Sequence, residues 1–274
     1  MAVSSLMFLL AATFISGKQG AVEFKQGAND LETKVKAVMN DVSNGQYPSN
    51  ANFTCTAAAG LPTPPTITVG TTIQGGNQGC IFLGKVIQFN VGGVGKNYNI
   101  YTIAARRVSV SGESVSSFAA ARPIAVDSIA TGPAYVASPI NLTQLNSLQS
   151  GLVVTRVVQC TSSGLCVTPV GAFGFFGSLG NYGLSQSSES QSGAQSVVTA
   201  KVPGTTYGDT EAATAQKINS SATSIAPVDI ISGGSSIVVC FMNGNLKGSL
   251  SIGGVGGQQS TTKLETGQGV APVC

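Results

Sequence analysis

Residues 2–42 read AVSSLMFLLAATFISGKQGAVEFKQGANDLETKVKAVMNDV, and this stretch decides the fold. No charge occurs before Lys18, so the first third is apolar or small. Farther along, apolar residues recur at i, i+4, i+7 and i+11, the spacing of one helix face: Leu31, Val35, Val38 and Val42. Proline is absent until Pro48, and Ser43-Asn44-Gly45 supplies a C-terminal stop. We therefore predict one nearly continuous helix, about 60 Å long, apolar at its start and amphipathic at its end.

The apolar segment, residues 2–15, is shorter than a full membrane span. A helix of that length reaches roughly 21 to 24 Å, whereas a bilayer core of about 30 Å requires about 20 residues. A secretory signal peptide has a similar apolar core behind a basic region, but here only Met1 precedes it. Two interpretations stay open: a continuous helix, which explains the absence of a cleavage site, and a cleaved signal followed by a surface helix.

The rest of the chain has the composition of a β-rich protein. Only 9% of the 274 residues are charged, which excludes a disordered acidic tail and a basic nucleic-acid arm as descriptions of the whole chain. Val, Ile and Ala are spread through Ser/Thr/Gly-rich sequence, as in many-stranded β proteins. We predict an α+β fold in which a long helix, residues 1–45, packs on a mainly antiparallel β-rich head, residues 46–274, with inserted loops at 111–235.

The residue types argue against an enzyme. The sequence has no His, which removes the usual general base and a common metal ligand, and its carboxylates are scattered. None of its Gly clusters has the Gly-x-Gly-x-x-Gly spacing of a dinucleotide site. We expect no catalytic residue, no cofactor, no metal site and no small-molecule substrate.

Local patterns predict several elements of the head. Three pairs of apolar runs read as paired strands: 81–91 with 98–110, 152–160 with 165–170, and 236–242 with 246–252. The last pair flanks Asn243-Gly244, the favoured sequence of a two-residue type I′ turn. We further predict loops at 55–80 and 171–195, weak helical character at 141–148 and a short surface helix at 209–219.

Six cysteines in a chain without His favour disulfides over zinc, and no Cys-x-x-Cys is present. Among the 15 possible connectivities, proximity in the sequence favours three pairs: Cys55–Cys80, Cys160–Cys166 and Cys240–Cys274. The alternative, buried free thiols, implies a reducing compartment. Disulfides instead agree with an exported head behind an apolar helix.

Three stretches of the N-terminal region resemble type IV pilin-like proteins, in particular minor pilins and pseudopilins: residues 23–26 (EFKQ), 29–32 (NDLE) and 40–48 (NDVSNGQYP). The hairpin at 236–252 is similar to the closing hairpin of H-type pseudopilins. The processing site of this family, a Gly followed by Phe-Thr-Leu-x-Glu, is absent, and we expect the natural start to lie upstream of Met1.

The resemblance implies a non-enzymatic subunit of a bacterial type IV pilus or type II secretion pseudopilus. It implies single-pass anchoring in the inner membrane before assembly, then packing among other pilin subunits in an extracellular filament. The side chains that it assigns to membrane and filament packing are Leu6, Phe8, Leu9, Leu10, Phe14 and Ile15. It also implies that the Leu31, Val35, Val38 and Val42 stripe packs on the head.

Two other functions stay open. A cleaved N-terminus would leave a secreted or surface adhesin whose partner is a host surface. A DNA-binding minor pilin is the other, because residues 81–160 are biased toward basic residues and place Tyr98 and Tyr101 near Arg106 and Arg107.

Overall fold

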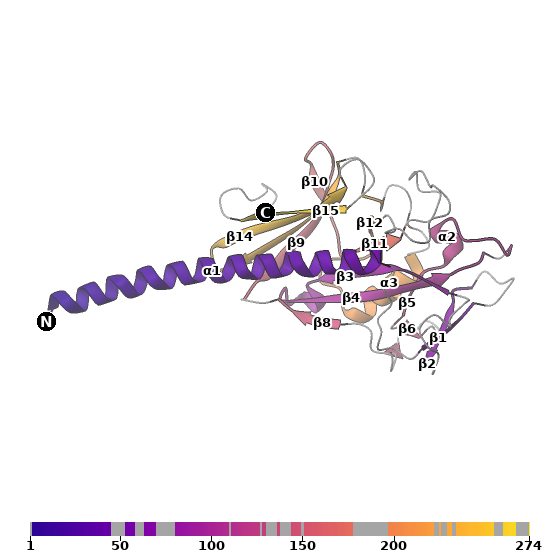
Figure 1. Ribbon diagram of the computed structural model, residues 1–274, viewed down its shortest axis with the longest axis horizontal. Helices are drawn as coiled ribbons and strands as arrows, with labels where there is room; N and C mark the ends of the chain where they lie inside the picture. The colour runs from indigo at the N-terminus through magenta and orange to yellow at the C-terminus, as the bar shows by residue number, and fades with distance from the viewer. Residues whose placement is uncertain are drawn as a thin grey trace.

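The computed structural model describes residues 2–44, 53–57, 63–69, 80–109, 111–126, 128–129, 136–137, 144–148, 151–177, 197–221, 225, 229–231, 234–254, 260–266 and 274. Among these, the backbone alone is described for residues 2–18, 53–55, 67–69, 128–129, 136–137, 144–147, 167, 221, 254 and 260–261. The first element is the helix α1 (Ala2–Ser43), 42 residues long. This confirms the predicted continuous helix. In Figure 1, α1 is a single rod that begins well outside the rest of the molecule and ends among the strands.

Two antiparallel sheets form the head. One has the order β10 (Cys166–Pro169), β9 (Val153–Cys160), β13 (Ser236–Asn243), β14 (Leu246–Gly254) and β15 (Ser260–Thr266). The other has the order β12 (Val197–Lys201), β11 (Ala172–Gly177), β3 (Cys80–Phe89), β4 (Asn97–Arg106) and β5 (Ile124–Ala125), with β8 (Gln144–Ser147) also on β4. The predicted α+β class, a long N-terminal helix on an antiparallel head, is confirmed.

Smaller elements complete the described part of the chain. The strands β1 (Phe53–Thr56) and β2 (Thr66–Val69) pair with each other, and β6 (Ser128–Ile129) pairs with β7 (Val136–Ala137). The loop predicted at 55–80 is therefore wrong for the end of β1 and for β2. A 3₁₀ turn, η1 (Val91–Gly93), joins β3 to β4. The helices α2 (Phe118–Ala121) and α3 (Glu211–Ser221) follow, and α3 confirms the helix predicted at 209–219.

All three predicted strand pairs are present, but the turn of the last one differs from the prediction. Asn243 is the final residue of β13 and pairs with Leu246, so the two turn residues are Gly244 and Asn245. Gly244 has a φ of 58°, while Asn245 is not among the residues with positive φ. The predicted type I′ turn is therefore wrong, because that turn needs positive φ at both central residues.

Two other local predictions are also wrong. Residues 172–177, predicted to be part of a long loop, form β11 between β3 and β12, while 178–196 lie outside the described residues. The two strands approach closely at a glycine of β3: a Cβ on Gly84 would lie 2.1 Å from the carbonyl oxygen of Phe175. Residues 144–147, predicted to be weakly helical, form β8, because pairing with the edge of β4 outweighs a weak local propensity.

The alternation of side chains along the strands produces the layers of the molecule. In β13, Ile237, Val239 and Phe241 face the core between the two sheets, where α1 also lies. Val238 and Cys240 face the opposite side, as the period of two requires. A separate core fills the space between the second sheet and the helices α2 and α3. The range 111–235, expected to carry inserted loops, supplies β9 and β11 in the interior of the two sheets.

Candidate functional site

The candidate site is α1 and the surface on which it lies. Residues 2–18, the projecting segment, extend beyond the sheets in Figure 1, whereas residues 19–43, the packed segment, run along them. The helix contacts β14 and β15 of the first sheet and β3, β11 and β12 of the second. The packed segment is thus held between the two sheets, and the projecting segment continues the same helix.

A stripe of apolar side chains fixes the packed segment. Leu31, Val35, Val38 and Val42 are all at most 3% exposed, which confirms the stripe predicted from their spacing. The stripe begins with two buried residues that were not predicted, Phe24 and Ala28, although they continue the same alternation of four and three residues. The ring of Phe24 lies 5.9 Å from that of Phe241 on β13. At about 1.5 to 3 kcal/mol for each large apolar side chain, this burial holds the helix firmly.

Polar contacts set the rotation of the helix on the sheets. At its C-terminal end, the Lys85 ammonium of β3 lies 2.6 Å from the Asp41 carboxylate. Nearer the middle, Glu32 pairs with Lys36 at 2.9 Å and accepts a hydrogen bond from the Thr262 hydroxyl of β15 at 3.0 Å. Each sheet thus makes one partly buried polar contact with α1: the first sheet through Thr262 and the second sheet through Lys85. Neither sheet can slide along α1 without breaking its contact.

The outward face of the packed segment is mainly polar, with Val22, 64% exposed, as its one large apolar side chain in the described residues. The six side chains predicted for membrane and filament packing, Leu6, Phe8, Leu9, Leu10, Phe14 and Ile15, lie outside the described side chains. Among the described residues, none of the helices has the length and apolar character needed to cross a membrane.

Two disulfides brace the face of the first sheet that is turned away from α1. Cys160–Cys166 and Cys240–Cys274 are both formed, as predicted, with Cα atoms 3.9 and 5.4 Å apart. They lie in one cluster with Val158 and Val238. Cys80 is also disulfide-bonded, but the Cys55 side chain lies outside the described residues, so the Cys55–Cys80 pair stays a prediction. The alternative of buried free thiols is wrong for the described cysteines.

The basic and aromatic residues considered for DNA contact are not gathered at the surface. Arg106 is 2% exposed, and its Nη1 donates to the Thr63 carbonyl oxygen at 3.2 Å. Arg107 is exposed, while Tyr98 and Tyr101 are buried and offer no face for base stacking. The expected contact through Arg106 is therefore wrong, because its side chain is buried against the segment around Thr63.

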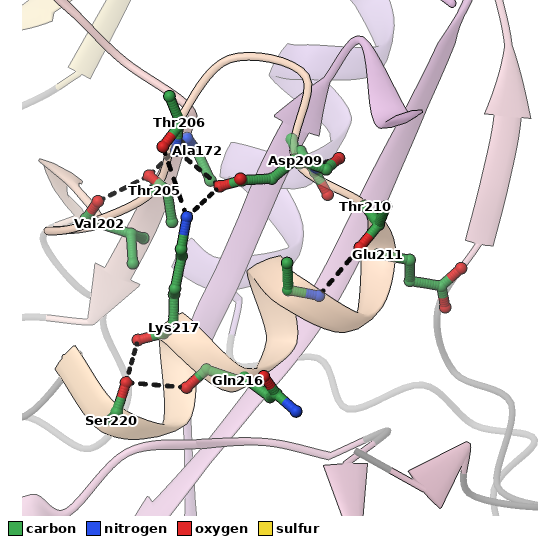
Figure 2. A network of polar contacts seen from close by, with 12 residues as sticks. Ala172, Val202, Thr205, Thr206, Asp209, Thr210, Glu211, Gln216, Lys217 and Ser220 are labelled. Carbon is green, nitrogen blue, oxygen red and sulfur yellow. Dashed lines mark hydrogen bonds and ion pairs between the residues drawn. The ribbon is translucent and has the colours of Figure 1, made fainter. Parts of the chain in front are cut away.

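A polar network fastens α3 to the second sheet (Figure 2). The ammonium of Lys217 lies 2.8 Å from the Asp209 carboxylate, which also accepts a hydrogen bond from the Thr206 backbone N–H. The Thr205 hydroxyl accepts from the Ala172 N–H of β11 at 2.9 Å and donates to the Val202 carbonyl oxygen. These contacts join α3 to the loop before it and, through Thr205, to β11, so the cluster supports the helix structurally.

Tyr207, in the loop before α3, gives the head a pH-dependent contact. Its hydroxyl donates to the Val154 carbonyl oxygen of β9 at 2.6 Å, and burial raises the pKa of Tyr207 to about 12. Because the pKa is higher in the folded protein, this stabilisation is complete below the pKa of about 10 of an unfolded Tyr. It is lost as the pH rises through about 12.

We expect Tyr207→Phe to lower the free energy of unfolding by about 1 kcal/mol at neutral pH. The decline in stability above pH 10 should become shallower, as measured by urea unfolding across the alkaline range. Part of the decline in the free energy of unfolding should remain, because Tyr98 also titrates there. The pKa of Tyr98 is raised mainly by burial and to a lesser degree by the charge of Asp30. An unchanged slope in the Phe variant would contradict the assignment.

Comparison of this chain with protein-family models, curated proteins and solved structures found no match.

Proposed function

We propose that this protein is a non-enzymatic filament subunit of the type IV pilin-like class, a minor pilin or pseudopilin of a bacterial type IV pilus or type II secretion pseudopilus. The observation that carries the proposal is α1 itself: one continuous helix whose packed segment is buried between two sheets and whose projecting segment extends beyond them.

The projecting segment carries the sequence AVSSLMFLLAATFIS, residues 2–16, in which 15 consecutive positions have no charge. Apolar surface of this extent needs a partner, because its exposure to water is unfavourable. Helices of other subunits can bury it in a filament core, and lipid can bury it before assembly. We propose both partners in that order, with the bacterial inner membrane first and neighbouring subunits afterwards.

The packed segment supports the same proposal mechanically. A filament subunit must transmit load from its helix to its head, and here the apolar stripe and the Asp41–Lys85 and Glu32–Thr262 contacts join the helix to both sheets. The disulfides at the opposite face are typical of proteins that fold outside the cytoplasm. An extracytoplasmic head on a membrane-embedded or filament-embedded helix accounts for both features.

The double substitution Leu9→Lys/Leu10→Lys tests this proposal. We expect membrane retention and incorporation into filaments to be lost, because charge is costly within either apolar environment, while the head stays folded. Cell fractionation measures retention, and disulfide mapping with near-UV circular dichroism measures folding of the head.

The matched control is Gln19→Lys/Val22→Lys, which adds two cations at exposed positions of the packed segment. This variant should be retained like the unaltered chain. Retention of the Leu9/Leu10 variant, or loss of folding in its head, would contradict the proposal. If mass spectrometry shows that the purified protein begins near residue 20, the filament proposal would be replaced by that of a secreted adhesin whose signal is cleaved.

A further inference from the structure

A pocket lies at the end of the molecule opposite the projecting segment. It has a volume of about 430 Å³ and is lined by Ser109, Ser111, Ala119, Ala120 and Arg122. Figure 1 shows α2, which supplies the two alanines, at the end of the head farthest from the N-terminus of α1. In a subunit held through α1, this pocket would face away from the anchored end.

The walls of the pocket are fixed by the backbone. One wall is the turn after β4, where the Ser109 N–H donates to the Glu113 carbonyl oxygen at 2.7 Å and Val108 forms a β-bridge with Ser114. The other wall is α2, whose Phe118 is buried with its ring edge-on to Phe176 at 5.1 Å.

Arg122 has a backbone conformation that an arginine does not normally favour. Its φ of 50° and ψ of 64° are left-handed, and its N–H donates to the Phe118 carbonyl oxygen at 3.0 Å to end α2. Gly or Asn usually occupies such a position, because a larger side chain is strained there. Strained residues of this kind are found at ligand clamps. Within the described part of the chain, the ion pairs join other charged side chains, and Arg122 takes part in none of them.

Ser109 and Ser111 add hydrogen-bonding hydroxyl groups to the cation of Arg122. The Ser109 and Ser111 hydroxyl oxygens are 2.8 Å apart, and either can be the donor of the hydrogen bond between them. That bond uses one of the two hydroxyl hydrogens, so the other can be donated to an acceptor in the pocket. A guanidinium and a hydroxyl together provide charge-assisted hydrogen bonds to an oxyanion.

We propose that this pocket binds a ligand of sugar size that carries one carboxylate. Its single cation balances the one negative charge of a carboxylate but not the charge of about −1.5 to −2 on a phosphate monoester. Ala119 and Ala120 present methyl groups that suit the C–H face of a sugar ring. The volume lies within the range of about 300 to 1,000 Å³ for small-molecule sites. An acidic sugar combines the single negative charge, the apolar ring face and the size that these features require.

This binding goes beyond the filament role, and its test does not depend on assembly. We expect the purified, disulfide-bonded full chain to bind D-galacturonate by isothermal titration calorimetry, and to bind neutral D-galactose roughly tenfold or more weakly. Arg122→Gly removes the guanidinium and suits the left-handed backbone, so the melting temperature should be kept or raised. Its affinity for galacturonate should fall by roughly tenfold to a hundredfold.

The matched control is Arg107→Ala, which removes an exposed cation from the same turn and should leave the affinity for galacturonate unchanged. Equal binding of galacturonate and galactose, equal binding by Arg122→Gly and the unaltered chain, or no saturable binding would overturn the proposal. Tighter binding of galactose 6-phosphate than of galacturonate would overturn the assignment to a carboxylate.

Discussion

The substitution Val35→Asp is expected to lower the free energy of unfolding by more than about 4 kcal/mol, enough to unfold a marginally stable domain. Val35 is 1% exposed and lies in the core shared by α1 and the two sheets. A carboxylate at this position would have no cationic partner in that apolar cluster, and it would either stay charged at high cost or take up a proton with a raised pKa. Either response removes stability from the packed segment.

The matched control is Ala37→Asp, which places the same side chain on the exposed face of the same helix two residues away. Its cost should be limited to the lower helix propensity of Asp, about 0.7 kcal/mol or less. Urea unfolding followed by circular dichroism compares the two variants. Similar losses in both would show that α1 is not held by its apolar stripe.

Removal of the Cys240–Cys274 disulfide, by the double substitution Cys240→Ser/Cys274→Ser, is the second large effect that we expect. The sequence separation of the pair is 34 residues, and the segment that it closes contains β14 and β15. Closure of a loop of that length restricts the unfolded chain by about 4 kcal/mol in the chain-entropy treatment. Since β14 and β15 both contact α1, the loss should also loosen the packed segment.

The internal comparison is Cys160→Ser/Cys166→Ser, which opens a disulfide with a sequence separation of only 6 residues. The same treatment gives about 2 kcal/mol for that loop. Thermal and urea unfolding of both double variants should therefore rank the Cys240–Cys274 variant as the less stable. A reversed order would show that local packing against Val158 and Val238, rather than loop closure, dominates the stabilisation.

Both predictions concern the link between α1 and the head, which the proposed filament role requires. A subunit whose helix is buried among its neighbours can present its head only if the packed segment stays attached. The buried stripe supplies that attachment from the helix, and the disulfide supports the strands on which the stripe lies.

Features that depend on neighbours along the chain were predictable from the sequence. The helix of residues 2–43 follows from the absence of Pro and from apolar residues repeating at helical spacing, and its buried face follows from the same period. The hairpins β3–β4, β9–β10 and β13–β14 follow from apolar runs separated by short turns. Two disulfides follow from the proximity of their cysteines within or beside those elements.

Only the tertiary structure decided the features that depend on contacts between distant segments. The Gly-rich residues 172–177 become an interior strand because β3 and β12 pair with both of their edges, and Gly84 admits the close approach. Arg106 is buried because the segment around Thr63 accepts its hydrogen bond. The pocket beside α2 joins a turn after β4 to a helix with a left-handed end. Local propensity holds no information on such pairings, because their free energy comes from surfaces that meet only in the folded chain.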